Sequence, residues 1–410
     1  MPFKNSNLAG IKGNNSFLLF LVSQVITCFG DAFHFIAITA LLIKITGFGT
    51  AAGFIVICTP ISSLLLSPFA GSLGDRLNEK YFLASTNLLK SLATLSFLSS
   101  RNIKTIYMLM LVLASLDIID NPPEKKIVTR LLNSKDIIIG NSILTGIAGF
   151  AFIIGPIVCG IVIESWGPDI IFIINSLLYF SSAIILLFIK NKKHTSNGAC
   201  TKTNPYNSIF GDIRSGIEHF KHRASVKKII FINTITSLLI ASINAAFYSF
   251  AFDILKINNS IWGIMMSFFY GTNLVSMFIS IYFNKSIQKT GLLFVYMALI
   301  ITSGVWFCYG SVDNLSLVFL LQFIEGLLLT LVAIFLNTKL QLVTGDGFIG
   351  RIVGINDILN NMAKLLSVSI TYIVLQFYSA RFVFISNCVF LFLYTIIMIG
   401  TDFKGKNKLF

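Results

Sequence analysis

Ionisable side chains inside otherwise apolar segments are the residues of this chain that could carry chemistry. Asp31 lies near the middle of a long apolar run, and His34 follows three residues later on nearly the same face of a helix. Glu325 lies in a second apolar run, one turn after Gln322. A third run carries polar residues spaced for one face of a helix: Asp117, Asp120, Asn121 and Glu124. Charged groups are costly in hydrocarbon, so such residues normally face a cavity or one another.

Buried acids of this kind are typical of proton-binding sites, because a carboxyl group in a poorly solvated place can exchange protons near neutral pH. We therefore expect at least one proton-binding group among four acids: Asp31, Asp117, Asp120 and Glu325. Structural alternatives stay open. Asp31 could accept a hydrogen bond from a neighbouring helix, Glu325 could pair with a lysine, and His34 could be a packed, hydrogen-bonded residue.

Two lysines lie about ten residues inside their apolar segments, whereas a lysine can snorkel only when it is close to an interface. We expect Lys364 to face a cavity, where it would hold an anionic substrate or neutralise an acid. For Lys90 we expect a structural ion pair or snorkelling.

The elements that must position these residues are membrane-spanning helices. The chain has 410 residues, of which 55% are hydrophobic and 12% charged, and 39 are phenylalanine. A soluble protein of this composition would lack a polar surface. The apolar runs are close to the roughly 20 residues that cross a bilayer as a helix. The sequence therefore predicts an all-α integral membrane protein.

Twelve apolar runs predict twelve transmembrane helices. They lie near residues 17–43, 51–73, 80–99, 105–127, 137–163, 169–190, 227–251, 259–284, 290–310, 315–339, 351–377 and 380–400. A polar stretch, 191–226, divides the chain into six-helix halves at 1–190 and 227–410, which we expect to be pseudo-symmetric bundles. The second part of this linker has amphipathic helical spacing, so we expect it on the membrane surface.

Basic residues are distributed unevenly between the two sides of the predicted membrane. The net charge is +14, and 24 of the 31 Lys and Arg residues fall in one set of loops and tails. The positive-inside rule places that set, with both termini, in the cytoplasm. The basic charge is explained by topology, so we expect no nucleic-acid partner.

Cofactor and metal motifs are absent from the sequence. The six cysteines are scattered without paired spacing, which predicts neither a disulfide framework nor a zinc site. No phosphate-binding glycine loop is present, so ATP would not drive this protein directly. We expect no metal and no cofactor. An intramembrane enzyme, with the acidic stripe at 117–124 as its site, is the competing class of function.

A charged segment between the second and third apolar runs carries a motif. It reads Gly-Ser-Leu-Gly-Asp-Arg-Leu-Asn-Glu-Lys over 71–80, with four charges that must lie outside hydrocarbon, and predicts a short hairpin at the membrane surface. It resembles the signature of the major facilitator superfamily, Gly-x-Leu-Ala-Asp-Arg-x-Gly-Arg-Lys/Arg. The matching residues are Gly71, Leu73, Asp75, Arg76 and Lys80. Gly74 replaces the usual Ala, Asn78 the second Gly and Glu79 the following Arg.

This resemblance implies a fold, a cavity and a gate. In the superfamily, helices one, four, seven and ten line a central cavity, and three of these helices carry the acids described above. The hairpin motif implies that Asp75 approaches the start of helix eleven, near Arg351, when the transporter is closed to the cytoplasm. Arg76 and Arg130 would hold Asp75 there. An anion at that helix end would be stabilised by the helix dipole.

Other segments resemble one branch of the superfamily, the macrolide-efflux and siderophore-exporter type. They are Ser23 through Phe29-Gly30-Asp31, Leu340-Gln341 and Gly350-Arg351-Ile352. In helix five, Gly155-Pro156 and Gly160 resemble the Gly-Pro segment of exporters, and imply a bend and close helix packing. Ala151 and Cys159 stand where that segment usually has glycine.

The resemblance implies a monomeric, proton-coupled exporter of a small solute in a bacterial cytoplasmic (inner) membrane. Lys364 favours a small anion such as a carboxylate siderophore. Efflux of a cationic macrolide-like drug is the alternative, and uptake comes third.

Overall fold

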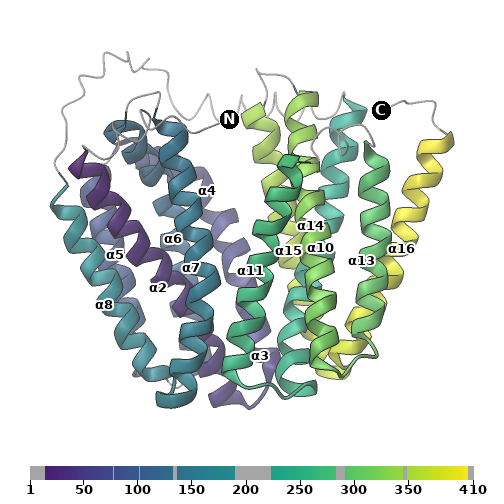
Figure 1. Ribbon diagram of the computed structural model, residues 1–410, viewed down its shortest axis with the longest axis horizontal. Helices are drawn as coiled ribbons and strands as arrows, with labels where there is room; N and C mark the ends of the chain where they lie inside the picture. Colours follow the sequence, from purple (N-terminus) through teal and green to yellow (C-terminus); the bar gives the residue numbers. More distant parts are fainter. Residues whose placement is uncertain are drawn as a thin grey trace. The chain divides into compact units, whose positions relative to one another are not determined.

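The structure is a computed structural model that describes residues 14–76, 78–100, 102–132, 136–189, 223–282, 291–344 and 349–404. Within these ranges all regular structure is helical (Figure 1). The first half of the chain forms α2 (Asn15–Thr46), α3 (Gly49–Gly53), η2 (Phe54–Ile57), α4 (Cys58–Arg76), α5 (Glu79–Ser96), α6 (Ile103–Leu131), α7 (Ile137–Trp166) and α8 (Pro168–Leu187). The second half forms α10 (Ala224–Ser249), η3 (Phe250–Ile254), α11 (Asn259–Tyr282), α13 (Leu292–Tyr309), α14 (Leu315–Thr344), α15 (Ile349–Phe377) and α16 (Ala380–Lys404).

The short segments α3 and η2 run directly into α4 and make one continuous helical segment, and η3 extends α10 in the same way. The described residues therefore contain the twelve long helices that the sequence predicts, and the predicted all-helical membrane fold is confirmed.

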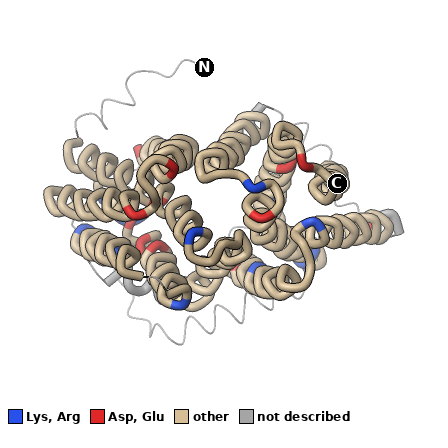
Figure 2. The backbone as a smooth tube through the Cα atoms, turned by 90° about the horizontal axis from the view of Figure 1, so that it is seen from below, with Lys and Arg blue, Asp and Glu red and all other residues tan. Residues whose placement is uncertain are grey.

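Ten of the described helices are long and apolar enough to cross a membrane on their own. The two long helices outside this set are α5 and α6, which are rich in charged residues: α5 carries Glu79, Lys80 and Lys90, and α6 carries Asp117 and Asp120 with further charges toward its end. Charged residues are otherwise sparse along the helices, and most of the chain in Figure 2 is drawn as uncharged.

The chain forms two compact units. Unit 1 comprises residues 1–197 with 257–270, and unit 2 comprises residues 198–256 with 271–410. The first part of α11 therefore belongs with unit 1. Most of the predicted linker, residues 191–222 of 191–226, lies outside the described residues, as does its predicted amphipathic helix. The domain limits at 190 and 227 stay predictions.

The charged motif at 71–80 lies differently from the sequence expectation. Helix α4 continues to Arg76, three residues beyond the predicted end at 73, so Gly71, Gly74 and Asp75 lie in the last helical turns. Only 77–78 separate α4 from α5, and Asn78 is extended. Glycine lowers helix stability without ending a helix, which is why the motif did not mark the boundary. The side chains of 71–77 lie outside the described residues.

Glycines bring α7 and the first part of α11 into close contact within unit 1. A Cβ atom on Gly160 would lie 2.6 Å from the carbonyl oxygen of Asn259, and one on Gly263 would overlap the carbonyl oxygen of Pro156. Glu164 joins the same two segments, since it accepts hydrogen bonds from Asn258 Nδ2 at 2.8 Å and from the Ser260 amide at 3.3 Å. Small residues of this kind are the usual means of close helix packing in membranes.

We expect the Gly263→Ala variant to be destabilised by about 1–3 kcal/mol, the usual cost of overpacking, because the new methyl group must displace the backbone of α7. The measurement is the thermal unfolding midpoint in detergent. Gly271→Ala on the same helix is the control, since nothing lies within 4 Å of the added atom. Equal midpoints for the two variants would contradict the close contact.

Candidate functional site

Lys90 lies at the centre of a buried ion cluster in unit 1. Its Nζ atom is 2.7 Å from Asp117 Oδ1 and 2.8 Å from Asp120 Oδ2, so it joins α5 to α6. The side chains of Lys90 and Asp120 are 4% and 5% exposed, whereas that of Asp117 is 53% exposed. Of the two expectations for Lys90, the structure shows the ion pair and not snorkelling.

Asp31 lies beside this ion pair and is bound by α8. The hydroxyl group of Tyr179 donates a hydrogen bond of 2.7 Å to Asp31 Oδ1, and Lys90 Nζ lies 6.0 Å from the centre of the Tyr179 ring. Gly30 permits this approach, because a Cβ atom there would lie 2.6 Å from Asn175 Oδ1 and 3.0 Å from the Tyr179 ring. The Gly-Asp pair in α2 therefore has a local reason in packing. Asp31 accepts a hydroxyl hydrogen bond, which is the structural alternative considered from the sequence.

A layer of further polar contacts lies next to the cluster, toward the beginning of α2. Thr27 and Ser182 hydroxyl groups are 2.9 Å apart, and Asn87 Nδ2 donates to Ser182 at 3.2 Å. Gln24 Nε2 donates to Glu124 Oε1 at 3.3 Å. Four helices of unit 1, α2, α5, α6 and α8, thus contribute polar side chains to one interior region.

A second ion cluster lies at the end of unit 1 where α2 and α5 begin. Glu79 is buried and bonds to Lys126 at 2.9 Å and to Arg130 at 2.8 Å. Lys80 donates a 2.8 Å hydrogen bond to the carbonyl oxygen of Ile189. Arg130 was expected to hold Asp75, and its described partner is Glu79. The contact between Asp75 and the start of α15 involves side chains outside the described residues, so the gating arrangement stays a prediction.

His34 and Asn121 do not bond to the ion cluster. His34 is buried and its ring centre lies 5.4 Å from that of Phe97, with no hydrogen bond to either ring nitrogen among the described residues. Asn121 is exposed and donates to the carbonyl oxygen of Asp117 on its own helix. Of the polar stripe predicted on α6, three acids bond to side chains of neighbouring helices: Asp117, Asp120 and Glu124. Asn121 does not.

Glu325 lies in unit 2 and has a different environment. It is buried and accepts hydrogen bonds from Trp306 Nε1 at 2.7 Å and from the Tyr309 hydroxyl at 3.0 Å. Among the described residues no lysine pairs with Glu325. Lys364, on α15, is half-buried, and the described part of the chain places no carboxylate within ion-pair distance of it. Its electrostatic partner is Asp357, two turns earlier on the same helix.

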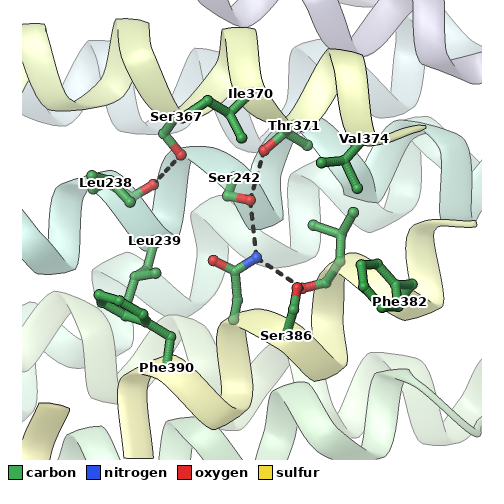
Figure 3. Close-up of a pocket in the computed structure, with 12 residues that line it drawn as sticks. Leu238, Leu239, Ser242, Ser367, Ile370, Thr371, Val374, Phe382, Ser386 and Phe390 are labelled. Carbon is green, nitrogen blue, oxygen red and sulfur yellow. Dashed lines mark hydrogen bonds between the residues drawn. The ribbon is translucent and has the colours of Figure 1, made fainter. Parts of the chain in front are cut away.

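Unit 2 also contains a cavity of about 260 Å³ between α10, α15 and α16 (Figure 3). Two bonds join its polar side chains, Ser242 to Thr371 at 2.7 Å and Asn387 Nδ2 to Ser242 at 3.0 Å. Ser367 and Ser386 donate to backbone carbonyl groups instead. Phe382 and Phe390 are among its apolar walls. Its lining is uncharged, so it suits a neutral or apolar group and not an anion.

Tyr179 and the Glu79 cluster are parts of the site that the sequence patterns above did not predict. A signal existed for Tyr179, since Asn175, Tyr179 and Ser182 follow helical spacing and form a polar face on α8. For Glu79 the signal was its departure from the family motif, which usually has Arg at this position. An acid there predicts different ion-pair partners from those of an arginine.

The geometry defines the class of protein. Twelve long helices with acids and a lysine inside one unit are typical of a multi-pass membrane protein, in which interior ionisable residues often mark a path for solutes or ions. The family model of the Major Facilitator Superfamily matches residues 20–367, most of the chain. The chain belongs to this superfamily of transporters, so it is a multi-pass membrane transporter with a small-molecule substrate.

Individual relatives are distant. A Bacillus subtilis (strain 168) protein described as an uncharacterized MFS-type transporter, YfmI, is 20% identical over 317 residues, which are 75% of this chain and 76% of that protein. The nucleoside transporter NupG has a TM-score of 0.74 at 13% identity, covering 94% of this chain and 98% of NupG. The POT family transporter PepTSo has a TM-score of 0.68 at 10% identity, with 96% and 99% covered. At these identities the solved structures show the fold alone.

Proposed function

We propose that this protein couples the export of a small organic solute to protons that enter down their gradient, and that the Asp31–Lys90 cluster is the coupling site. The observation that supports coupling is an imbalance of charge inside unit 1. Asp31, Asp120 and Glu124 lie in the interior with one buried ammonium group, Lys90. Asp117, the fourth acid, is half-exposed and already bonded to the same lysine.

Asp120 is buried, and Asp31 and Glu124 are partly buried. These three carboxylates cannot all stay ionised beside one ammonium group without a cost, because uncompensated charge away from water is destabilising. Protons or small cations must supply the missing positive charge. The absence of a nucleotide-binding motif in the sequence leaves an ion gradient as the energy source. Protons suit this cluster, because Asp31 is held by a hydroxyl group that can bond to either form of the carboxyl.

The substrate that we favour is a small anion, such as a carboxylate siderophore. The support is Lys364, a half-buried ammonium group in a membrane helix with no ion pair among the described residues. Such a group is best compensated by an anion. Cationic drug efflux of the macrolide type is the second candidate, followed by uptake. The uncharged cavity of unit 2 favours neither anion nor cation.

The proposed setting is a bacterial cytoplasmic membrane, with both termini in the cytoplasm and the protein working as a monomer. The uneven distribution of Lys and Arg supports this orientation.

Transport by the purified protein in proteoliposomes tests the proposal. Vesicles with an imposed pH gradient should move a carboxylate siderophore against its concentration gradient, and an uncoupler should abolish this accumulation. The solute should be recovered chemically unchanged, since a changed product would indicate an intramembrane enzyme. Accumulation that persists after the pH gradient is collapsed would contradict proton coupling. In that case, accumulation driven by an imposed sodium gradient would identify sodium as the coupling ion.

A further inference from the structure

We propose that His34, Thr94 and Asn175 bind a small cluster of water molecules beside the Asp31–Lys90 cluster. These three side chains share an unusual property. Each is at least nine-tenths buried, at 9%, 0% and 0% exposure, and none has a hydrogen-bond partner among the described residues. The orphaned atoms are both ring nitrogens of His34, the Thr94 hydroxyl, and both polar atoms of the Asn175 amide.

The three residues lie at one level of unit 1, about one helical turn beyond the ion cluster. His34 follows Asp31 on α2, Thr94 follows Lys90 on α5, and Asn175 precedes Tyr179 on the antiparallel helix α8. Contacts between the helices fix the register: the Ser91 and Ser176 hydroxyl groups are 2.8 Å apart, and each adjoins this level. The Phe97 ring, whose centre lies 5.4 Å from that of His34, stacks on Phe172 at 5.2 Å.

An unsatisfied polar atom in a buried site is costly, at about 1–3 kcal/mol each. Flipping the Asn175 amide or changing the His34 tautomer does not remove the cost, because both polar atoms of each side chain lack partners. Thr94 also differs from other buried threonines in the helices of this protein. Thr302 and Thr395 donate to the carbonyl four residues earlier, as threonines in helix interiors commonly do, and Thr94 does not. Unsatisfied donors and acceptors at one buried level are what bound water requires.

The water cluster has a use that rests on the proposed proton coupling. It would connect Asp31 with His34, one turn closer to the end of α2, and so hydrate the coupling site from the side that the positive-inside rule places outside the cell. The charged groups whose fields reach His34 are Asp117 on α6 and Lys90 on α5. Around them, Asp120 pairs with Lys90, Tyr179 donates to Asp31, and Cys159 on α7 donates to the carbonyl oxygen of Phe33, next to His34 in the chain.

The Thr94→Val variant gives a test whose sign separates bound water from an empty site. If water is bound, the change deletes one of its hydrogen bonds, and the thermal unfolding midpoint should fall below that of wild type. If the site is empty, the change removes an unsatisfied hydroxyl group, and the midpoint should stay equal or rise. The Thr302→Val variant measures the cost of losing an ordinary helix hydrogen bond and is the matched control.

A second measurement detects the water directly, without any transport. Hydroxyl radicals made by X-ray pulses from bound water oxidise adjacent side chains, which mass spectrometry quantifies. Phe97 should be labelled several-fold faster than Phe384, an equally buried ring in unit 2. The Thr94→Val, Asn175→Leu double variant should lose this excess. Equal labelling of the two rings in wild type would overturn the proposal. If Phe97 is labelled faster but transport proves not to be coupled to protons, the water site is supported and only its role in coupling is contradicted.

Discussion

Replacing Lys90 by methionine is expected to abolish transport and to lower the free energy of unfolding by about 3–5 kcal/mol, the usual cost of breaking a buried ion pair from one side. Lys90 is the described cation that bonds to both Asp117 and Asp120, at 2.7 and 2.8 Å. Its loss leaves the buried Asp120 without the cation that compensates its charge. The measurements are the thermal unfolding midpoint in detergent and transport in proteoliposomes.

A matched variant separates charge from packing in this prediction. Lys90→Met combined with Asp117→Asn and Asp120→Asn removes all three charges, and should recover most of the lost stability while transport stays absent. If the single Lys90→Met variant is as stable as wild type, Lys90 does not compensate the two acids. If the triple variant transports at the wild-type rate, the cluster has no part in coupling.

The Asp31→Asn variant is expected to lose the response of transport to a pH gradient while the protein still folds and exchanges substrate. Asparagine keeps the size of the side chain and its hydrogen bond with Tyr179, but it cannot bind and release a proton. The measurement is the ratio of transport rates with and without an imposed gradient, which should fall to about one when no proton is exchanged.

The control for Asp31 is Asp313→Asn, which removes an exposed acid bonded to Arg381 outside the cluster. This variant should keep the wild-type ratio. If the Asp31→Asn protein still responds to the gradient, Asp31 is not the coupling residue, and Glu124 or Glu325 becomes the candidate.

The number and type of the helices could be predicted from the sequence, because hydrophobic length is set by the bilayer and needs no knowledge of partners. Asp31, Asp117 and Asp120 could also be identified, since each interrupts an apolar run. Their partners could not. Tyr179 lies 148 residues after Asp31, and no local pattern specifies which helices face each other.

The end of α4 shows a different limit. The hairpin motif marks charge at a membrane surface, but Gly71 and Gly74 do not stop the helix, which continues to Arg76. Lys90 shows a third limit. Its position deep in a helix predicts that its charge needs a partner, but it does not predict which acids provide one. The pairing depends on the side-by-side arrangement of α5 and α6.

That arrangement bears on how the chain enters the membrane during synthesis. Helices α5 and α6 are the two long helices in the described ranges that are too polar to cross alone, and they are consecutive in the chain. A lysine or aspartate at the centre of a helix opposes insertion by about 2.5–3.5 kcal/mol. Lys90 can meet Asp117 and Asp120 as soon as the second helix is made, so insertion of the two as a hairpin removes most of this cost. The Lys90 ion pairs, which we propose as part of the coupling site, would thus also ease insertion of the chain.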